Sequence, residues 1–415
     1  MQVPAPEAHL ARQITLPLLI LYGLSVTVGA GVYVLIGETA ARAGQHAPLA
    51  FVIAGVLVAF SAASYAELAT RFPVSAGEAA YVGAATQAPW APLVIGLLVC
   101  ASGLFSSATL LRGGAGYVQE FIAAPTAVIA LVTGLLIGAV AAWGIKQSVW
   151  TAALLAVAEV GLLLVIAVFG VATAPVGPTA VGAFAPTDSS MVFGLSGAVL
   201  IAFFAFIGFE DMVNVAEEVR DPRRTIPWAI GLTLVFTTLL YVSVLIVALS
   251  VASPEVLSGS PAPLTLVFQR ILGGDGRIVS AIAIAAVVNG VLVQIVMVSR
   301  VLYGMSRLGS LPSWLGFIWP ATQTPLVATA VTVGCVLVLV LVPQIAVLAD
   351  LTSTFTLLVF ASVNFALWRI KINEPIVDHA YFRVPHWVPV TGFLVSSFFL
   401  VFEWFNRFNG HLVGP

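Results

Sequence analysis

Long apolar runs, separated by short stretches that hold nearly all the charges, dominate the sequence. A helix needs about 20 apolar residues to cross a bilayer, and backbone groups in lipid have no water to bond, so each run is predicted to be a transmembrane helix. The pattern predicts eleven spans, at roughly residues 14–36, 48–70, 90–119, 124–144, 150–172, 192–217, 227–252, 278–303, 325–343, 346–370 and 384–404.

The composition supports an integral membrane protein. Of 415 residues, 60% are hydrophobic and only 8% are charged, whereas soluble domains carry about 25% charged residues. The net charge of −2 gives no reason to expect a nucleic-acid partner. The two cysteines and five histidines lack metal-ligand spacing. We therefore expect no metal, no cofactor and no catalytic centre.

The loop charges predict the orientation, because cytoplasmic loops carry an excess of Lys and Arg. With a cytoplasmic N-terminus, eleven of the 16 basic residues face the cytoplasm, and eleven spans leave the C-terminus outside. We expect a multi-pass protein of the plasma membrane, which in a bacterium is the inner membrane. The inner set is Arg12, Arg71, Lys146, Arg220, Arg223, Arg224, Arg300, Arg307, Arg369, Lys371 and Arg383, and the outer set is Arg42, Arg112, Arg270, Arg277 and Arg407.

Two predicted spans contain residues that favour a break in the helix. Span 1 has Val28-Gly29-Ala30-Gly31 near its middle, and span 6 has Phe206-Ile207-Gly208-Phe209. A five-helix unit used twice puts these breaks in corresponding positions, and the odd offset gives the two units opposite topology. Interrupted helices in matching places of two halves point to a binding site at the membrane midplane.

Four stretches resemble the amino acid–polyamine–organocation transporters. They are "GLSVTVGAGVYVLIG" in span 1, "YAELATRFPVSAGEAAYV" after span 2, "AFFAFIGFEDMVNVAEEVRDPRRTIP" in span 6 and its tail, and "SRVLYGMSRLGSLP" at the end of span 8. The resemblance covers residues 14 to 370 and implies an all-α leucine-transporter-type fold, a 5+5 inverted repeat with broken helices 1 and 6. Many members have twelve spans, so this chain departs from them at its end.

The resemblance also implies a division of the chain. We expect a cytoplasmic N-terminus at 1–13, a first five-helix repeat at 14–172, an external loop at 173–191, a second repeat at 192–370, and a further helix with a tail at 371–415.

The break in span 1 is predicted to receive the carboxylate of a substrate. Glycine lets the chain leave helical geometry, and the freed N–H groups lie at the positive end of the outer half-helix. The alternative is a small-residue packing face, for which Gly29 and Gly31 have the wrong spacing.

The break in span 6 is predicted to bind the other end of the substrate, its amino group. By resemblance, the carbonyls of Phe204, Ala205 and Ile207 accept the amino group. Phe203 or Phe206 is expected to act as an aromatic lid, and ordinary packing is the alternative. The predicted substrate-binding residues are Val28, Gly29, Ala30, Gly31, Phe203, Phe204, Ala205, Phe206, Ile207, Gly208 and Asn289.

Glu159 is the predicted coupling residue. It lies in the middle of span 5, and no other charge occurs between Lys146 and Asp188. A carboxylate at that depth costs about 2.5–3.5 kcal/mol on insertion scales, so it should face protein or a cavity. By resemblance, some proton-coupled members of the family place a lysine at the matching position, which lies near a sodium site in others. The alternative is a permanently protonated, hydrogen-bonded side chain. Glu159 has no partner evident in the sequence.

Other polar residues leave their roles open. Asn289 and Gln294 in span 8 line the cavity or bond between helices. Glu210 and Asp211 attract a cationic substrate, or favour the positive start of a half-helix. The charges after span 6 form either a solvated face or an inner gate, for which the candidates are Glu217, Glu218, Arg71 and Arg300.

The sequence therefore predicts a secondary active transporter rather than an enzyme. We expect it to move amino acids or related amines by alternating access, with the proton as coupling ion and the lipid bilayer as its surroundings. The alternatives are a polyamine or organocation exchanger, an uncoupled facilitator, or a sensor or channel of the same fold.

Overall fold

The computed structural model describes residues 12–412 except 29, 87, 120, 175–176, 178–181, 185–188, 261–262, 343–344 and 375–380. The described part is helical throughout, and its bridges are two isolated ones, Ile14 with Val219 and Trp319 with Thr324. The predicted fold class is therefore correct at the level of an all-α membrane protein. Within the described residues, seven helical segments are long and apolar enough to cross a bilayer, and four shorter apolar helices accompany them.

The helices follow the predicted apolar runs, since each run can satisfy its backbone polar groups only within itself. The helices that follow these runs without a break are α3 (Ala47–Arg71), α5 (Ala91–Gln119), α6 (Thr126–Trp143), α7 (Ile145–Thr173), α10 (Pro222–Val251), α13 (Arg277–Arg307), the shorter α14 (Leu326–Leu339), α15 (Ile345–Asn373) and α16 (Trp387–Leu412).

Predicted spans 1 and 6 are each interrupted. Span 1 is divided into α1 (Leu16–Thr27) and α2 (Ala30–Ala43). Span 6 is divided into α9 (Ser189–Phe204) and η2 (Phe209–Glu218), a 3-10 helix, with a turn between them. Whether eleven segments cross the membrane as two inverted repeats stays a prediction.

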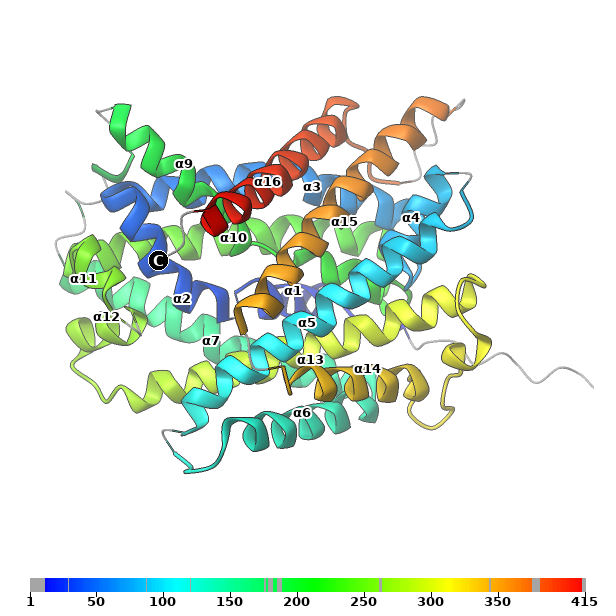
Figure 1. Cartoon of the computed structure of the whole chain (residues 1–415), viewed down its shortest axis with the longest axis horizontal. Helices are drawn as coiled ribbons and strands as arrows, with labels where there is room; N and C mark the ends of the chain where they lie inside the picture. Colours follow the sequence, from blue (N-terminus) through cyan, green and yellow to red (C-terminus); the bar gives the residue numbers. More distant parts are fainter. Residues whose placement is uncertain are drawn as a thin grey trace, which may run out of the picture.

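Several short helices lie in the predicted loops, where the sequence pattern indicated none. They are η1 (Gly44–His46), α4 (Gly77–Ala85), α11 (Pro254–Ser258), α12 (Pro263–Leu272) and η3 (Ser313–Gly316). In Figure 1 the long helices run mostly across the view, with α11 and α12 at the left and α4 at the right. The right-hand end is the predicted cytoplasmic end.

The interior forms by lengthwise packing around the broken helices. α13 packs along α5 and α7, α10 along α3, and α15 between α5 and α16. α1 contacts α7, α10 and η2, so α1 lies inside the bundle (Figure 1). This arrangement brings residues from α7, α10 and α13 to the two breaks.

Candidate functional site

The two breaks touch at backbone level. Gly208 ends the turn after α9 with φ 122°, in the left-handed region that favours glycine. A Cβ at Gly208 would lie 2.6 Å from Val26 Cγ1 and 3.2 Å from the Val26 carbonyl carbon. Val28 ends α1, and α2 resumes at Ala30 and Gly31. Gly29 lies outside the described residues.

Tyr241 of α10 holds the two breaks together. Its buried hydroxyl donates to the Thr27 carbonyl at 2.6 Å and lies 3.2 Å from the Ala205 carbonyl. Because both carbonyls lie where helices stop, they lack regular intrahelical donors. Sequence analysis missed this residue. A single tyrosine in the middle of an apolar run was the available signal.

The aromatic side chains of the second break point in different directions. The Phe203 ring lies 4.4 Å from Phe399 of α16, centroid to centroid, and 6.4 Å from Phe360 of α15. Phe206 packs beside Tyr241 at 5.6 Å. Both phenylalanines are fully buried. The backbone of Phe204 ends α9, and its side chain lies outside the described set; Ala205 and Ile207 form the turn.

Glu159 and Asn289 lie together beside α1. The Asn289 amide nitrogen donates to Glu159 Oε1 at 2.9 Å and to the Ser25 carbonyl at 3.2 Å. Both side chains are fully buried. The structure thus gives Glu159 the partner that the sequence did not reveal. The contact joins α7 and α13 to α1 one turn before the break.

One oxygen of each side chain in this pair lies without a hydrogen-bond partner in the described part of the chain. Among the described residues, Glu159 Oε2 and Asn289 Oδ1 are buried without a hydrogen bond. An unsatisfied buried polar atom is costly. A proton on the carboxyl group, or a water or cation beside it, would relieve that cost.

The two acids that follow Gly208 bind groups of the protein itself. Glu210 Oε2 accepts a hydrogen bond from the Gly208 backbone N–H at 2.8 Å. Asp211 Oδ2 accepts one from the Gln294 amide at 2.7 Å. Glu210 therefore caps the start of η2, an arrangement that a helix N-terminus favours. Gln294 reaches η2 rather than an open cavity.

Two of the gate candidates form a buried ion pair between η2 and α13. Arg300 Nε lies 2.9 Å from Glu218 Oε1, and both side chains are fully buried. Glu217 instead accepts a hydrogen bond from the backbone N–H of Ser75 at 2.9 Å, just before α4. The two acids at the end of η2 therefore tie it to neighbouring segments at the predicted cytoplasmic end.

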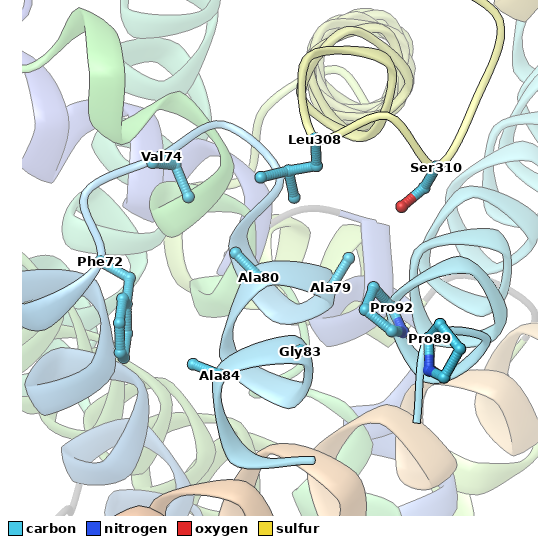
Figure 2. A pocket seen from close by; sticks show the side chains of 10 residues that line it. All are labelled: Phe72, Val74, Ala79, Ala80, Gly83, Ala84, Pro89, Pro92, Leu308 and Ser310. Carbon is cyan, nitrogen blue, oxygen red and sulfur yellow. The ribbon is translucent and has the colours of Figure 1, made fainter. Parts of the chain in front are cut away.

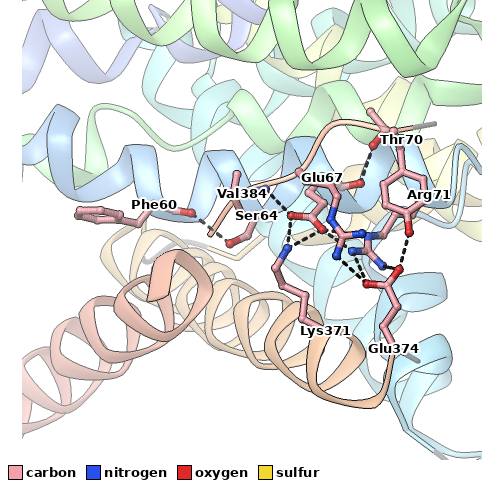
Figure 3. A network of polar contacts seen from close by, with 10 residues as sticks. Phe60, Ser64, Glu67, Thr70, Arg71, Lys371, Glu374 and Val384 are labelled. Carbon is pink, nitrogen blue, oxygen red and sulfur yellow. Dashed lines mark hydrogen bonds and ion pairs between the residues drawn. The ribbon is translucent and has the colours of Figure 1, made fainter. Parts of the chain in front are cut away.

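Arg71 lies in a different group of charges (Figure 3). It bonds Glu67 one turn earlier on α3, and Glu374 just after α15. Lys371 Nζ also donates to both Glu67 oxygens, at 2.8 and 2.7 Å. This network fastens α3 to α15, and the structure does not bring Arg71 to Glu217 or Glu218. Burial by itself would raise the pKa of Glu374, but hydrogen bonds from Tyr381 and Arg71 hold it below its ordinary value.

A cavity of about 400 Å³ lies at the predicted cytoplasmic end, away from the breaks. Figure 2 shows that its lining is mostly apolar and comes from α4, the residues around it and the end of α13. Ser310 is its one hydroxyl-bearing lining residue. It offers no charged group to a substrate.

Comparisons with known proteins give a family and relatives along nearly the whole chain. A family model described as amino acid permease matches residues 16–412. The cationic amino acid transporter 3 of Arabidopsis thaliana is 30% identical over 88% of this chain and 63% of its own length. The branched-chain amino acid permease BcaP of Bacillus subtilis is 30% identical over 95% of this chain and 88% of its own.

A methylthioribose transporter of Bacillus subtilis is 26% identical over 95% of this chain and 88% of its own. The chain spans somewhat less than two thirds of the length of the plant cationic transporters it matches. These relatives are transporters rather than enzymes. The match along nearly the whole chain, together with two broken helices that meet inside the bundle, shows that the protein belongs to the amino acid permease family, in the amino acid–polyamine–organocation superfamily.

Proposed function

We propose that the protein is a secondary active transporter that moves amino acids across the bilayer by alternating access, coupled to protons. The observation that carries this proposal is the contact between the two helix breaks, bridged by Tyr241. Residues 14–172 then form one five-helix repeat and residues 192–370 the second. The protein lies in the plasma membrane, and its N-terminus lies in the cytoplasm.

Backbone groups at the breaks bind the carboxylate and ammonium groups that all amino acids share. The start of α2 directs N–H groups and a positive helix end at the carboxylate. The turn after α9 supplies carbonyls for the ammonium group. Gly208 lets the second break approach Val26 of α1 closely, and Gly31 leaves room for the substrate at the start of α2. The proposed substrate contacts are therefore Val28 to Gly31, the residues from Phe203 to Gly208, and Asn289.

The side chain of the substrate meets a surface that is less polar than the backbone groups at the breaks. Phe203 and Phe206 are buried and aromatic, while Glu210 and Asp211 are already hydrogen-bonded within the protein. This favours an apolar amino acid over a cationic one. One relative is named for branched-chain and another for cationic amino acids, so both classes belong in the test.

Uptake of radiolabelled leucine, valine, arginine and spermidine into liposomes tests the proposal. We expect accumulation of an apolar amino acid under an inward proton gradient. Uptake that only equilibrates would indicate a facilitator. Preferred accumulation of arginine or spermidine would show that the substrate is cationic rather than apolar. Specific substrate binding without any uptake would indicate a sensor and contradict the proposal.

Glu159 is proposed to couple transport to protons. Protonated, its carboxyl group can remain packed against Asn289 beside α1. Deprotonated, its unpartnered oxygen demands water or a cation, which favours an open cavity next to α1. A proton shifts the two states only as far as it binds one of them better.

The variant Glu159→Gln mimics the neutral form. We expect it to retain substrate exchange and to lose stimulation by an inward proton gradient. Glu38→Gln is the control, because Glu38 pairs with Arg42 on the exposed surface. If Glu159→Gln liposomes still accumulate substrate under a proton gradient alone, the residue is structural. A wild-type response to sodium alone would make it a sodium ligand.

Glu218 and Arg300 are proposed to form the inner gate. Their ion pair is fully buried and joins η2 to α13. Opening the predicted cytoplasmic end must therefore separate or move this pair. Arg71 and Glu217 are proposed to act beside it, by holding α3 and the segment before α4.

A further inference from the structure

Four arginines gather at the predicted cytoplasmic end of η2 and α10. Arg220 precedes α10, and Arg223 and Arg224 lie in its first turn. The N-terminal segment brings Arg12 to them, because the Arg220 N–H donates to the Ile14 carbonyl at 2.8 Å. Arg220 Nε also donates to the Arg12 carbonyl at 3.3 Å. All four side chains are exposed.

The arginines of this basic patch carry more positive charge than the described acids beside them offset. Among the residues that the structure describes, no ion pair joins any of the four arginines to a carboxylate. The nearby acids are used elsewhere, Glu218 by Arg300 and Glu217 by Ser75. Asp221, the one acid within the run, is the N-cap residue of α10, but its side chain makes no capping hydrogen bond. Beyond this N-cap, the first turn of α10 carries no acidic residue.

An apolar stripe continues from the patch along the same face of α10. Trp228, Leu232, Val235 and Leu239 are 60%, 42%, 59% and 63% exposed. They follow Arg224 at steps of four, four, three and four residues, the spacing of one helix face. Tryptophan is typical of the membrane interface. This face therefore presents a cation, then an interfacial ring, then an apolar surface.

We propose that an anionic phospholipid of the cytoplasmic leaflet binds here. Its phosphate is held by Arg12, Arg220, Arg223 and Arg224, and an acyl chain lies along the stripe below Trp228. Basic clusters just cytoplasmic of a membrane helix attract anionic headgroups. The stripe selects a lipid over a free anion, because a free anion would use only the arginines.

The lipid also bears on the gate. The segment that carries Arg12 is also held beside η2 by the backbone N–H groups of Gln13 and Ile14, which donate to the Glu218 carbonyl at 2.9 and 3.0 Å. That pairing joins the start of α1 to the end of η2. An anion between the arginines relieves their repulsion and so stabilises the closed end. The binding site stands without the transport proposal, whereas this effect on the gate rests on it.

Lipid binding is measured on the purified full-length protein. Phosphatidylglycerol or phosphatidylcholine is titrated into the detergent-solubilised protein, and the melting temperature is followed. We expect phosphatidylglycerol to raise it. In the double variant Arg223→Gln/Arg224→Gln, about tenfold more of this lipid should be needed for the same rise. The charge-conserving Arg223→Lys/Arg224→Lys variant should retain most of the effect.

Arg277→Gln is the matched control. Arg277 is also an exposed arginine in the first turn of a long helix, at the opposite end of the bundle. Its phosphatidylglycerol titration should match that of the wild type. Equal responses of the wild type and the Arg223→Gln/Arg224→Gln variant would overturn the site. An equal rise with inorganic phosphate, without lipid, would overturn the choice of a lipid.

A second measurement locates the lipid. Brominated phosphatidylglycerol quenches tryptophan fluorescence on contact, and the part of the quenching lost in Trp228→Phe reports on the stripe. We expect this loss to exceed that in Trp150→Phe, which removes another half-exposed tryptophan at the same end. Brominated phosphatidylcholine should show no such difference. Equal losses with the anionic lipid would contradict the site.

Finally, the effect on the gate is measured as exchange of substrate in liposomes with and without phosphatidylglycerol. We expect the anionic lipid to slow exchange in the wild type and to have a weaker effect on Arg223→Gln/Arg224→Gln. If the lipid binds without changing exchange, the gate effect is wrong while the site stands. A failed transport proposal would instead show as no exchange in any lipid.

Discussion

At the scale of single residues, a few side chains decide how the interrupted helices meet. Tyr241 is the most informative, since one hydroxyl serves carbonyls at the ends of both α1 and α9. Gly208 performs the complementary task by bringing its backbone against Val26. Tyr241 supplies a hydrogen-bond donor to the two helix ends, and Gly208 allows them to approach closely because it has no side chain.

Removing the Tyr241 hydroxyl should weaken the contact between the breaks. Tyr241→Phe leaves two buried carbonyls without this donor, which costs about 1–3 kcal/mol. We expect a lower melting temperature and slower uptake. Tyr22→Phe is the control, because among the described residues the buried Tyr22 hydroxyl has no hydrogen-bond partner. Equal effects of the two variants would show that Tyr241 acts through packing alone.

Adding one methyl group at Gly208 should disrupt the site. In Gly208→Ala the new Cβ would lie 2.6 Å from Val26 Cγ1, and the φ of 122° disfavours any side chain. We expect loss of substrate-induced thermal stabilisation, which rises with occupancy. Gly231→Ala is the control, because nothing lies within 4 Å of a Cβ at Gly231 of α10. Undiminished stabilisation in a folded Gly208→Ala variant would argue against this site.

At the scale of elements, charged networks join helices that are distant in sequence. α3, α15 and the segment before α16 meet at Glu67, which also accepts a hydrogen bond from the Val384 N–H at 2.8 Å (Figure 3). α16, which lies beyond the two predicted repeats, is therefore fastened to the bundle at this end. It also reaches the proposed site through Phe399.

The contribution of Glu374 to the stability of the protein should depend on pH. Despite burial, hydrogen bonds from Tyr381 and Arg71 lower the pKa of Glu374, so its contribution to stability is present above the unfolded pKa of about 4.3. It is lost as the pH falls through the lowered folded pKa. Glu374→Gln should therefore melt below the wild type at neutral pH, and the gap should close in acid. A gap that is the same at every pH would contradict this.

At the scale of the whole molecule, orientation is the property that the charge distribution predicts. The basic residues at the ends of α3, α13 and α15 and at the start of α10 gather at one end of the bundle. The positive-inside rule then places that end in the cytoplasm.

Topology reporters test this placement. Fusions at residues 145, 223 and 371 should report the cytoplasm, and a fusion after residue 410 should report the outside. The three inner fusions depend on the charge asymmetry, whereas the last depends on eleven spans. A cytoplasmic signal after residue 410 alone would therefore mean that the number of spans is wrong.

The sequence by itself determined the helical membrane architecture, because the length of an apolar run and the bilayer thickness are local quantities. It also located both helix breaks, since the glycines and the turn that interrupt the helices are local too. Its resemblance to known transporters indicated the family.

Only the tertiary structure decided which residues meet at the breaks. Tyr241 lies 214 positions from Thr27, and Asn289 lies 130 positions from Glu159. The same holds for Arg71, which the sequence offered to the gate and the fold assigns to Glu67 and Glu374. No local pattern encodes such pairs, because they depend on how whole helices cross. Helix crossing is set by side-chain packing over the full length of each contact.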